Sequence, residues 1–157
     1  MLGEILTDLH EIASSDGPAP ALVGAVLADV RRLVLPHHED ARGAISWLNL
    51  PGLPFTPVRA YWLTDWHALD RGVHAHRHLH QLYVAVHGAV TVHLDDATQS
   101  GVERLDNPHD ALLLPPMTWR RLTDPTPGTV LLAFASGLHD ETEILRDHAL
   151  FLAEARR

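Results

Sequence analysis

The sequence contains no cysteine and no lysine among its 157 residues, and each absence removes a class of chemistry. Without cysteine there are no disulfides, no thiolate nucleophiles and no cysteine-based zinc sites. Without lysine, no Schiff base to a carbonyl substrate is possible. All twelve basic residues are arginines. Because arginine suits planar, bidentate recognition of phosphate, the composition leaves phosphate binding open.

Basic charge and long apolar runs are also scarce. The net charge is -8 at pH 7, and proteins that bind nucleic acids normally carry a basic surface, so we expect no nucleic-acid partner. The apolar runs are too short to cross a bilayer, so we expect no membrane partner. An acidic residue precedes the first basic one, which argues against a secretory signal. Together with the lack of cysteine, this favours a cytoplasmic protein.

The length fits one domain with its own core, preceded by a short extension. Apolar residues recur at helical spacing in residues 1–13 and again in 22–30, and the Ser-, Gly- and Pro-rich residues 14–20 separate the two segments. We therefore predict a helical extension over residues 1–29, which packs on the domain or contributes to a dimer contact. The remaining residues, 30–157, form the domain.

Short apolar segments with turn residues between them dominate the region after residue 30. We expect strands at 33–35, 44–48, 58–64, 101–105, 111–115, 118–122 and 129–135, in addition to the histidine-rich stretch described below. Short strands at this spacing predict an all-β sandwich or barrel. The string Asp140–Glu143 is similar to a capping box and predicts one C-terminal helix after it.

The stretch Arg71–Gln81, RGVHAHRHLHQ, is the most unusual part of the sequence. If it is extended, alternate side chains lie on one face. That face holds the histidines and the apolar residues that follow them: His74, His76, His78, His80, Leu82, Val84 and Val86. We therefore predict a strand whose inner face begins as a reactive pocket and continues as core.

One interpretation of these histidines is a metal site. Three imidazoles on one face, from His74, His76 and His80, could bind zinc, iron or nickel. The spacing of His74 and His76 between Gly72 and Gly88 is similar to the motif of metal-binding cupin barrels. A further histidine ligand is expected from a later strand, but Arg120 stands there, and a cation beside a metal is unfavourable. We therefore predict no metal and no other cofactor.

A second interpretation is acid–base chemistry without a metal. Histidine has an ordinary pKa of ~6.5, so it can take and return a proton near neutral pH. Inward-facing His74 and His76 lie about 7 Å apart along a strand and could act on adjacent atoms of one substrate. A 1,2 shift of a carbonyl along a sugar, through an enediol, needs this arrangement. Arg71 or Arg120 could stabilise the enediolate or hold a phosphate. A third interpretation gives the histidines no role beyond partial solvation.

The string Arg71–His76, RGVHAH, also has a family resemblance. Further matching pieces occur in order at Asp40–Gly43, Pro54–Phe55, Arg59–Tyr61, Gln81, Gly88, Leu94–Asp96, Leu105–Asp106, Pro108, Pro116–Arg120, Ala135–Ser136 and Asp140–Thr142. Together they resemble the WxcM-like cupins, the nucleotide-sugar 3,4-ketoisomerases, over about residues 30–152.

This resemblance implies a fold and an activity. The fold is a cupin, a double-stranded β-helix or jelly-roll barrel, in a homodimer. The substrate is a dTDP-4-keto-6-deoxyhexose, which is converted to its 3-keto isomer without a metal. His74 and His76 carry the proton transfers, and their individual roles stay open. The other candidate site residues are Tyr61 and Arg71 for catalysis, and Arg59, His80, Gln81, Trp119 and Arg120 for substrate binding.

Two other functions remain open. One is a different cupin reaction on a sugar nucleotide, either epimerisation or metal-dependent chemistry, and the other is a sugar-nucleotide-binding cupin without activity. The sequence departs from the family pattern at Trp62, at Leu138–His139 and at Ile144. These positions could shape the pocket, so they bear on the substrate more than on the reaction.

Overall fold

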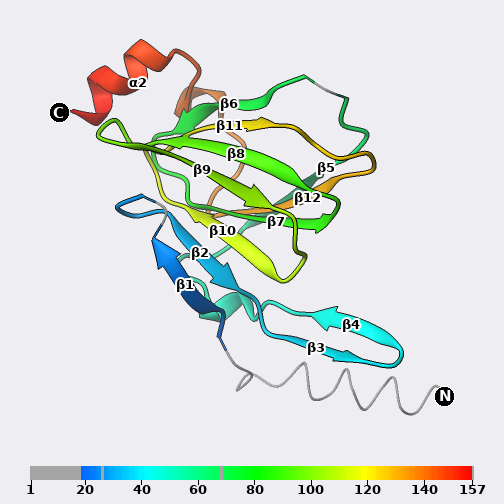
Figure 1. Ribbon diagram of the computed structural model, residues 1–157. Helices are drawn as coiled ribbons and strands as arrows, with labels where there is room; N and C mark the ends of the chain where they lie inside the picture. The colour runs from blue at the N-terminus through cyan, green and yellow to red at the C-terminus, as the bar shows by residue number, and fades with distance from the viewer. Residues whose placement is uncertain (1–18, 26, 68, 157) are drawn as a thin grey trace.

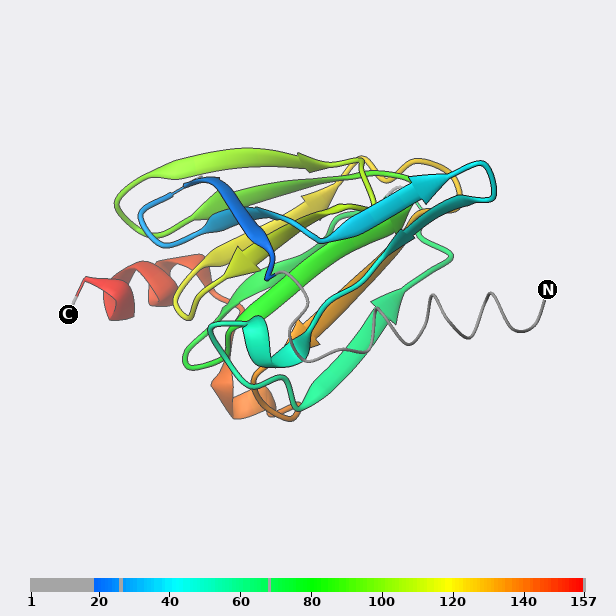
Figure 2. The ribbon, with the colours of Figure 1, turned by 90° about the horizontal axis from the view of Figure 1, so that it is seen from below.

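The computed structural model describes residues 19–25, 27–67 and 69–156 and has two antiparallel sheets packed face to face (Figures 1 and 2). The six-stranded sheet has the order β1 (Ala21–Ala25), β2 (Arg31–Val34), β10 (Asp110–Leu114), β7 (Gln81–His87), β12 (Val130–Ala135), β5 (Arg59–Leu63). The five-stranded sheet has the order β13 (Ile144–Leu145), β6 (Arg71–His76), β11 (Trp119–Thr123), β8 (Val90–Asp95), β9 (Ser100–Leu105). The predicted all-β cupin barrel is therefore confirmed.

The barrel interior is filled by apolar residues from both sheets. In β8, buried and partly buried residues alternate, because successive side chains of a strand point to opposite faces. The interior cluster comprises Leu27, Val30, Trp66, Tyr83, Ala85, Val90, Val92, Leu94, Leu105, Leu112, Leu114, Leu122, Leu131 and Ala133. Each fully buried leucine of this set contributes about 1.5–3 kcal/mol to the hydrophobic stabilisation of the fold.

Strand β7 is buried on both of its faces. Tyr83 and Ala85 belong to the interior cluster, whereas Leu82 and Val84 pack in a second cluster on the outer face of the sheet. That outer cluster includes Leu53 and is completed by residues near the 3₁₀ turn η1 (Leu50–Gly52). A continuous apolar run is typical of a strand covered on both sides.

The predicted continuous histidine strand is wrong in one respect. Strand β6 ends at His76, and β7 begins at Gln81 in the other sheet, so residues 77–80 are a connection. The change of sheet resets the alternation of faces. Leu82 and Val84 therefore lie on the outer face of their sheet and do not share the inner face of His74 and His76, and His78 and His80 lie in the connection.

The predicted helix over residues 22–30 is also wrong. Residues Ala21–Ala25 form strand β1, which pairs antiparallel with β2 from Ala21 opposite Val34 to Ala25 opposite Arg31. Its apolar spacing fits a helix as well as a strand in so short a window, and the free edge of β2 decides between them. The helix predicted at 1–13 lies outside the described residues. The boundary at 29/30 stays a prediction, with β1 on its N-terminal side.

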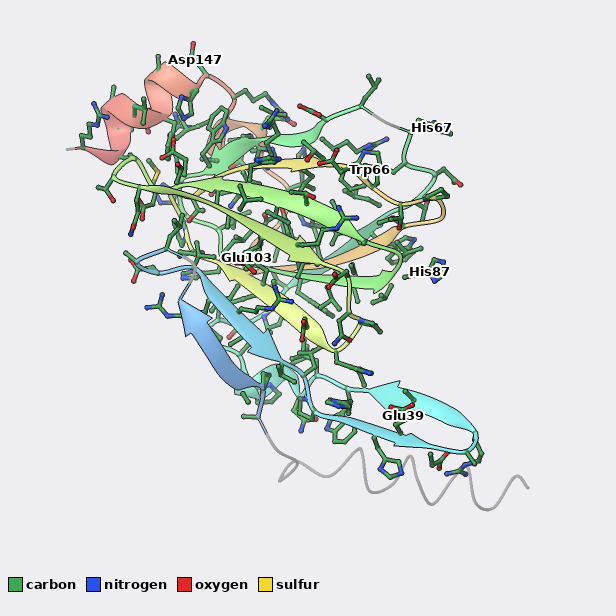
Figure 3. The ribbon with its side chains drawn as sticks, viewed as in Figure 1. Glu39, Trp66, His67, His87, Glu103 and Asp147 are labelled. Atoms are coloured by element: carbon green, nitrogen blue, oxygen red, sulfur yellow. The ribbon has the colours of Figure 1, made fainter. Side chains whose placement is uncertain are left out.

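The C-terminal region differs from the prediction in where its helix starts. Asp140 caps only the 3₁₀ turn η2 (Glu141–Glu143), accepting a hydrogen bond from the Thr142 amide. Strand β13 then pairs with β6, placing Ile144 opposite His76. Helix α2 (His148–Ala155) begins after a second cap, Asp147, which Figure 3 shows at its start. A helix at the C-terminus is confirmed, but the capping box does not begin it.

A hairpin extends from the barrel, and among the described strands its two strands pair only with each other. It consists of β3 (His37–Asp40) and β4 (Gly43–Ser46), and its residues are almost all exposed. Figures 1 and 3 show it beside the six-stranded sheet, with Glu39 far from the barrel interior. Within the described residues, no helix has the length and apolar character needed to cross a membrane.

Candidate active site

The histidine pair of β6 faces the interior of the barrel from the five-stranded sheet. The Nε2 atoms of His74 and His76 lie 3.1 Å apart, and the two rings are nearly perpendicular, at 89°. His76 is only 3% exposed. The predicted inward projection of both histidines agrees with this geometry, and the side chains approach far more closely than the strand spacing of about 7 Å.

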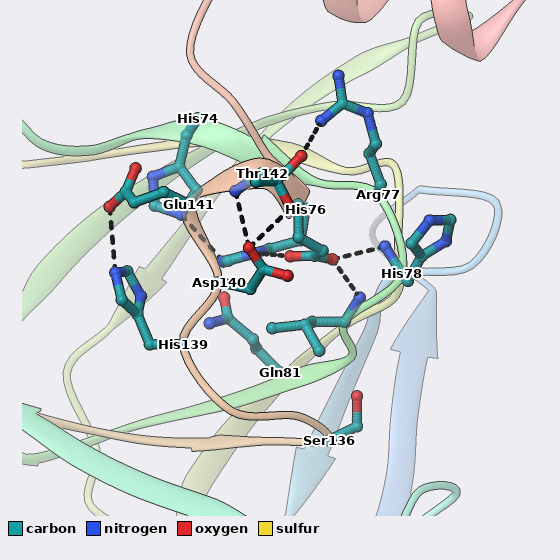
Figure 4. Close-up of polar contacts among 12 residues, drawn as sticks. His74, His76, Arg77, His78, Gln81, Ser136, His139, Asp140, Glu141 and Thr142 are labelled. Atoms are coloured by element: carbon teal, nitrogen blue, oxygen red, sulfur yellow. Dashed lines mark hydrogen bonds and ion pairs between the residues drawn. The ribbon is translucent and has the colours of Figure 1, made fainter.

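Glu143 is a partner of His76 that the sequence analysis missed. Its Oε2 accepts a hydrogen bond from Nδ1 of His76 at 2.7 Å, and its Oε1 accepts the backbone N–H groups of His78 at 2.6 Å and Leu79 at 2.9 Å (Figure 4 shows the surroundings). The sequence assigned this glutamate to a helix cap. Only the pairing of β13 with β6 brings it to the histidines.

The charges around this pair favour neutral imidazoles beside an ionised carboxylate. Burial, followed by the charge of Arg120, lowers the pKa of His74 to about 3. The same two causes lower the pKa of His76 to about 4, although Glu143 opposes them. Burial acts to raise the pKa of Glu143, but the hydrogen bonds from the His78 amide and from His76 outweigh it and leave the pKa below its ordinary value. At neutral pH both imidazoles are therefore neutral.

Arg120 brings an unpaired cation into the same region. It lies on β11 opposite His74 and is fully buried, yet none of its three guanidinium nitrogens has a hydrogen-bond partner among the described residues. Burial lowers its pKa, and the nearby tyrosines and Glu143 act in the opposite direction. A buried cation without a partner costs several kcal/mol by rough estimate. An anionic or strongly polar oxygen in the interior would offset that cost.

The six-stranded sheet contributes a second polar array. The Tyr83 hydroxyl donates to Oε1 of Gln81 at 2.8 Å, and Nε2 of Gln81 donates to the Tyr61 hydroxyl at 2.9 Å. Strand β12 makes this contact possible, because Ala133 stands between Tyr61 and Tyr83, and its small side chain leaves the interior between the rings open. Tyr83 was not predicted from the sequence, where it looks like an ordinary strand aromatic.

A cavity of about 200 Å³ lies between the two arrays. It is lined by Tyr61, Leu63, Arg71, Gly72, His74, Tyr83, Leu122, Leu131 and Ala133. The volume is below the ~300–1,000 Å³ of a pocket for a whole ligand, so it suits one sugar ring rather than a nucleotide sugar. Gly72 has φ +59°, and a Cβ there would lie 3.2 Å from Cδ1 of Leu122, so the cavity wall favours glycine.

The predicted arginines of the site take three different positions. Arg120 is enclosed, as described above. Arg71 is exposed and lines the cavity, with its guanidinium carbon 6.0 Å from the centre of the Trp66 ring, and Figure 3 shows Trp66 in the connection from β5 to β6. Arg59 lies over the ring of Tyr61 at 5.2 Å, and its buried Nε has no partner among the described residues. Of these three cations, Arg71 is the one that lines the cavity.

Two predicted residues lie apart from this group. His80 stacks on Phe55, with the ring centres 5.8 Å apart, outside the cavity. Trp119 packs against His148 and Phe151 of α2. The structure brings Tyr61, His74, His76, Gln81 and Arg120 together and does not bring His80 or Trp119 to them, so substrate contacts of these two residues stay predictions. In the parts of the chain that the structure describes, no three His, Asp or Glu side chains gather as metal ligands.

Known proteins resemble the chain over most of its length. The family model described as WxcM-like, C-terminal (FdtA) matches residues 28–156. The TDP-4-oxo-6-deoxy-alpha-D-glucose-3,4-oxoisomerase of Aneurinibacillus thermoaerophilus is 32% identical over 114 residues, which are 71% of this chain and 82% of that protein.

Two solved structures have the same fold at similar identity. A 3,4-ketoisomerase from Helicobacter canadensis is 30% identical, with a TM-score of 0.78 over 82% of this chain and 98% of its own. The sugar 3,4-ketoisomerase QdtA of Thermoanaerobacterium thermosaccharolyticum, in complex with TDP, is 30% identical, with a TM-score of 0.80 over 83% of this chain and 96% of its own. The chain therefore belongs to the WxcM-like family of cupins.

Proposed function

We propose that this protein is a nucleotide-sugar 3,4-ketoisomerase that converts a dTDP-4-keto-6-deoxyhexose into its 3-keto isomer. The observation that carries the proposal is the neutral, hydrogen-bonded pair of His74 and His76, of which His74 lines a sugar-sized cavity beside the unpaired Arg120. The relatives support the substrate class, because those named above are 3,4-ketoisomerases or the equivalent oxoisomerase. A histidine-to-asparagine variant of the Thermoanaerobacterium enzyme has been crystallised with TDP-4-keto-6-deoxyglucose.

The reaction needs a base, an acid and a way to hold negative charge. A neutral imidazole removes the proton from C3, next to the C4 carbonyl, and the electrons of that bond form an enediolate with its charge on O4. The proton on O3 moves to O4 as the C3 carbonyl forms, and C4 takes a proton from the imidazolium. Atoms and charge balance without a metal or other cofactor, and the two histidines are close enough to share these transfers.

We assign stabilisation of the enediolate to Arg120, which lies opposite His74 on β11. Its charge is fixed in the interior before the reaction starts, and no described side chain uses its donors. A preorganised donor aimed at a developing oxyanion is typically worth about 10²–10³ in kcat. Tyr61 lines the cavity and its hydroxyl accepts from Gln81, so the hydroxyl can contact a sugar oxygen there.

The nucleotide part of the substrate needs a position outside the small cavity. Arg71 lines the cavity and is also exposed, so it can contact a diphosphate at the mouth while the sugar lies inside. Arg59 is the second candidate for this contact, because its guanidinium already lies over Tyr61.

We also propose that the enzyme is a cytoplasmic homodimer. The absence of cysteine is compatible with a reducing compartment. The β3–β4 hairpin supports the dimer, since an isolated two-stranded hairpin is marginally stable in water and gains by packing on a second subunit. Sedimentation equilibrium tests this proposal, and the mass of a monomer at micromolar concentration would contradict it.

Incubation with dTDP-4-keto-6-deoxyglucose in heavy water, followed by NMR, tests the activity. We expect a new 3-keto sugar nucleotide, with deuterium at C3 or C4. An epimerase would instead give a stereoisomer that keeps the 4-keto group, and a metal-dependent reaction would stop on removal of metal with a chelator. Tight binding of dTDP with neither product nor deuterium exchange would identify a binding protein and contradict the proposal.

A further inference from the structure

The hydrogen bonds that end at Glu143 have a fixed direction. The backbone N–H groups of His78 and Leu79 both point at Oε1, and a backbone amide can only donate, so Oε1 is always an acceptor. The other carboxylate oxygen, Oε2, faces Nδ1 of His76 at 2.7 Å. Because the carboxylate is ionised, it also accepts, and Nδ1 of His76 must carry the hydrogen.

The direction of the His76–Glu143 hydrogen bond also determines the direction of the hydrogen bond between His76 and His74. A neutral imidazole with its hydrogen on Nδ1 has none on Nε2, so Nε2 of His76 is an acceptor. It faces Nε2 of His74 at 3.1 Å, which must then carry a hydrogen and donate. Nδ1 of His74 is left without a hydrogen and is the atom of the pair that can take a proton.

We propose that Glu143 is a positioning residue that sets the tautomers of both histidines and thereby decides which imidazole nitrogen is free to act as the base. This inference rests on the proposed ketoisomerase function for its catalytic meaning, although the tautomers themselves do not depend on it. Glu143 contacts His76 and is not among the residues that line the cavity, so it acts through His76.

The arrangement also carries a proton away from the cavity. When Nδ1 of His74 gains a proton, its Nε2–H can pass to Nε2 of His76. The positive charge then rests on His76, 2.7 Å from the carboxylate of Glu143. In other proton-transfer sites, too, a carboxylate orients a histidine and stabilises its protonated form. Return of the proton along the same path restores the starting tautomers.

The substitution Glu143→Gln gives a sharp test, because the backbone determines how the new side chain points. The amide NH₂ cannot accept, so the carbonyl oxygen of the glutamine must stay on the His78 and Leu79 amides, and the NH₂ must face His76. Nδ1 of His76 then has to accept, its hydrogen moves to Nε2, and the hydrogen bond to His74 reverses. The shape and the number of hydrogen bonds are unchanged, but both tautomers are exchanged.

Imidazole ¹⁵N NMR of the labelled protein at pH 7 measures the tautomers directly. We expect His76 with hydrogen on Nδ1 and His74 with hydrogen on Nε2 in the wild type, and the opposite pair in Glu143→Gln. The control is Glu141→Gln, the same substitution on an exposed residue of the same turn, which should leave both histidines as in the wild type. Wild-type tautomers in Glu143→Gln, in a protein that melts like the wild type, would overturn the proposal.

Kinetics with dTDP-4-keto-6-deoxyglucose give the second measurement. A base presented in the wrong tautomer typically costs about 10⁴ in kcat, so we expect a loss of about 10²–10⁴-fold in kcat with little change in KM. Glu143→Asp keeps the charge and should recover part of the loss. An active wild type with an equally active Glu143→Gln would overturn the inference, whereas an inactive wild type would contradict the proposed function and leave the NMR result to decide the tautomers.

Discussion

The two polar arrays of the barrel interior are built differently. The histidine array, Glu143–His76–His74, ends in an ionised carboxylate that fixes the direction of every hydrogen bond. The tyrosine array, Tyr83–Gln81–Tyr61, is neutral throughout, and its hydroxyl groups can rotate. A proton moved along the first array finds a countercharge, whereas a proton moved along the second does not. We infer that the first performs the transfers and the second binds the sugar, and the predictions below test that division.

The largest effect is expected from the histidine array. His76→Asn removes the acceptor between His74 and Glu143, so we expect kcat to fall by about 10²–10⁴-fold with the fold intact. The measurement is turnover of dTDP-4-keto-6-deoxyglucose, with circular dichroism to check folding. His78→Asn, on an exposed neighbour, is the control and should retain activity. Unchanged turnover in His76→Asn would remove this array from the mechanism.

Replacing Arg120 should lower the activity and raise the stability of the protein. Arg120→Met removes the enediolate's partner, so we expect kcat to fall by about 10²–10³-fold. It also removes a buried, unpaired cation, so we expect the free energy of unfolding to rise by about 1–4 kcal/mol. Denaturant unfolding measures the second effect. The control is Arg121→Met, on the exposed next residue of the strand, which should change neither kcat nor the free energy of unfolding much. If Arg120→Met were instead less stable than the wild type, the guanidinium would have a partner in the folded protein.

The tyrosine array should give smaller losses. Tyr83→Phe removes the donor to Oε1 of Gln81 and leaves a buried acceptor unpaired, which costs about 1–3 kcal/mol of stability. Because Gln81 still donates to Tyr61, we expect kcat to fall by no more than about tenfold, with the larger change in KM. Steady-state kinetics and thermal melts measure both. A loss in kcat as large as that of His76→Asn would end the division between the arrays.

The pH dependence of stability tests the histidine array without any substitution. The pKa values of His74 and His76 are about 3 and about 4 in the folded state, against an ordinary value of 6.5. Below pH 6.5 the unfolded chain therefore binds more protons than the folded one, and stability falls as the pH falls.

Each histidine contributes a slope of about 1.4 kcal/mol per pH unit between pH 6 and about 4. Denaturant unfolding at pH 5 and 6 measures it. His74→Asn removes one of the two titrating histidines, so it should lower the slope by about 1.4 kcal/mol per pH unit. An unchanged slope would mean that His74 titrates normally in the folded protein.

The sequence predicted the barrel and much of its interior for a physical reason. Strand alternation and the RGVHAH string place His74 and His76 on one face without further information, and the arginine in the place of a late metal ligand pointed to Arg120. What it missed depends on contacts between segments far apart in the chain. Glu143 meets His76 through the two-residue strand β13. The face of β7 that carries Gln81 and Tyr83 points inward because residues 77–80 reset the alternation.

Strand β12 has a consequence for which sugars the enzyme accepts. Its inner face carries Ala133 where a larger residue would close the gap between Tyr61 and Tyr83, so the methyl group of Ala133 forms the cavity lining between the two rings. Substitution of Ala133 by serine and then by valine would therefore narrow the cavity in small steps without changing any group that moves a proton. We therefore expect substitutions at Ala133 to change which sugars bind and to leave the proton transfers of His74 and His76 in place.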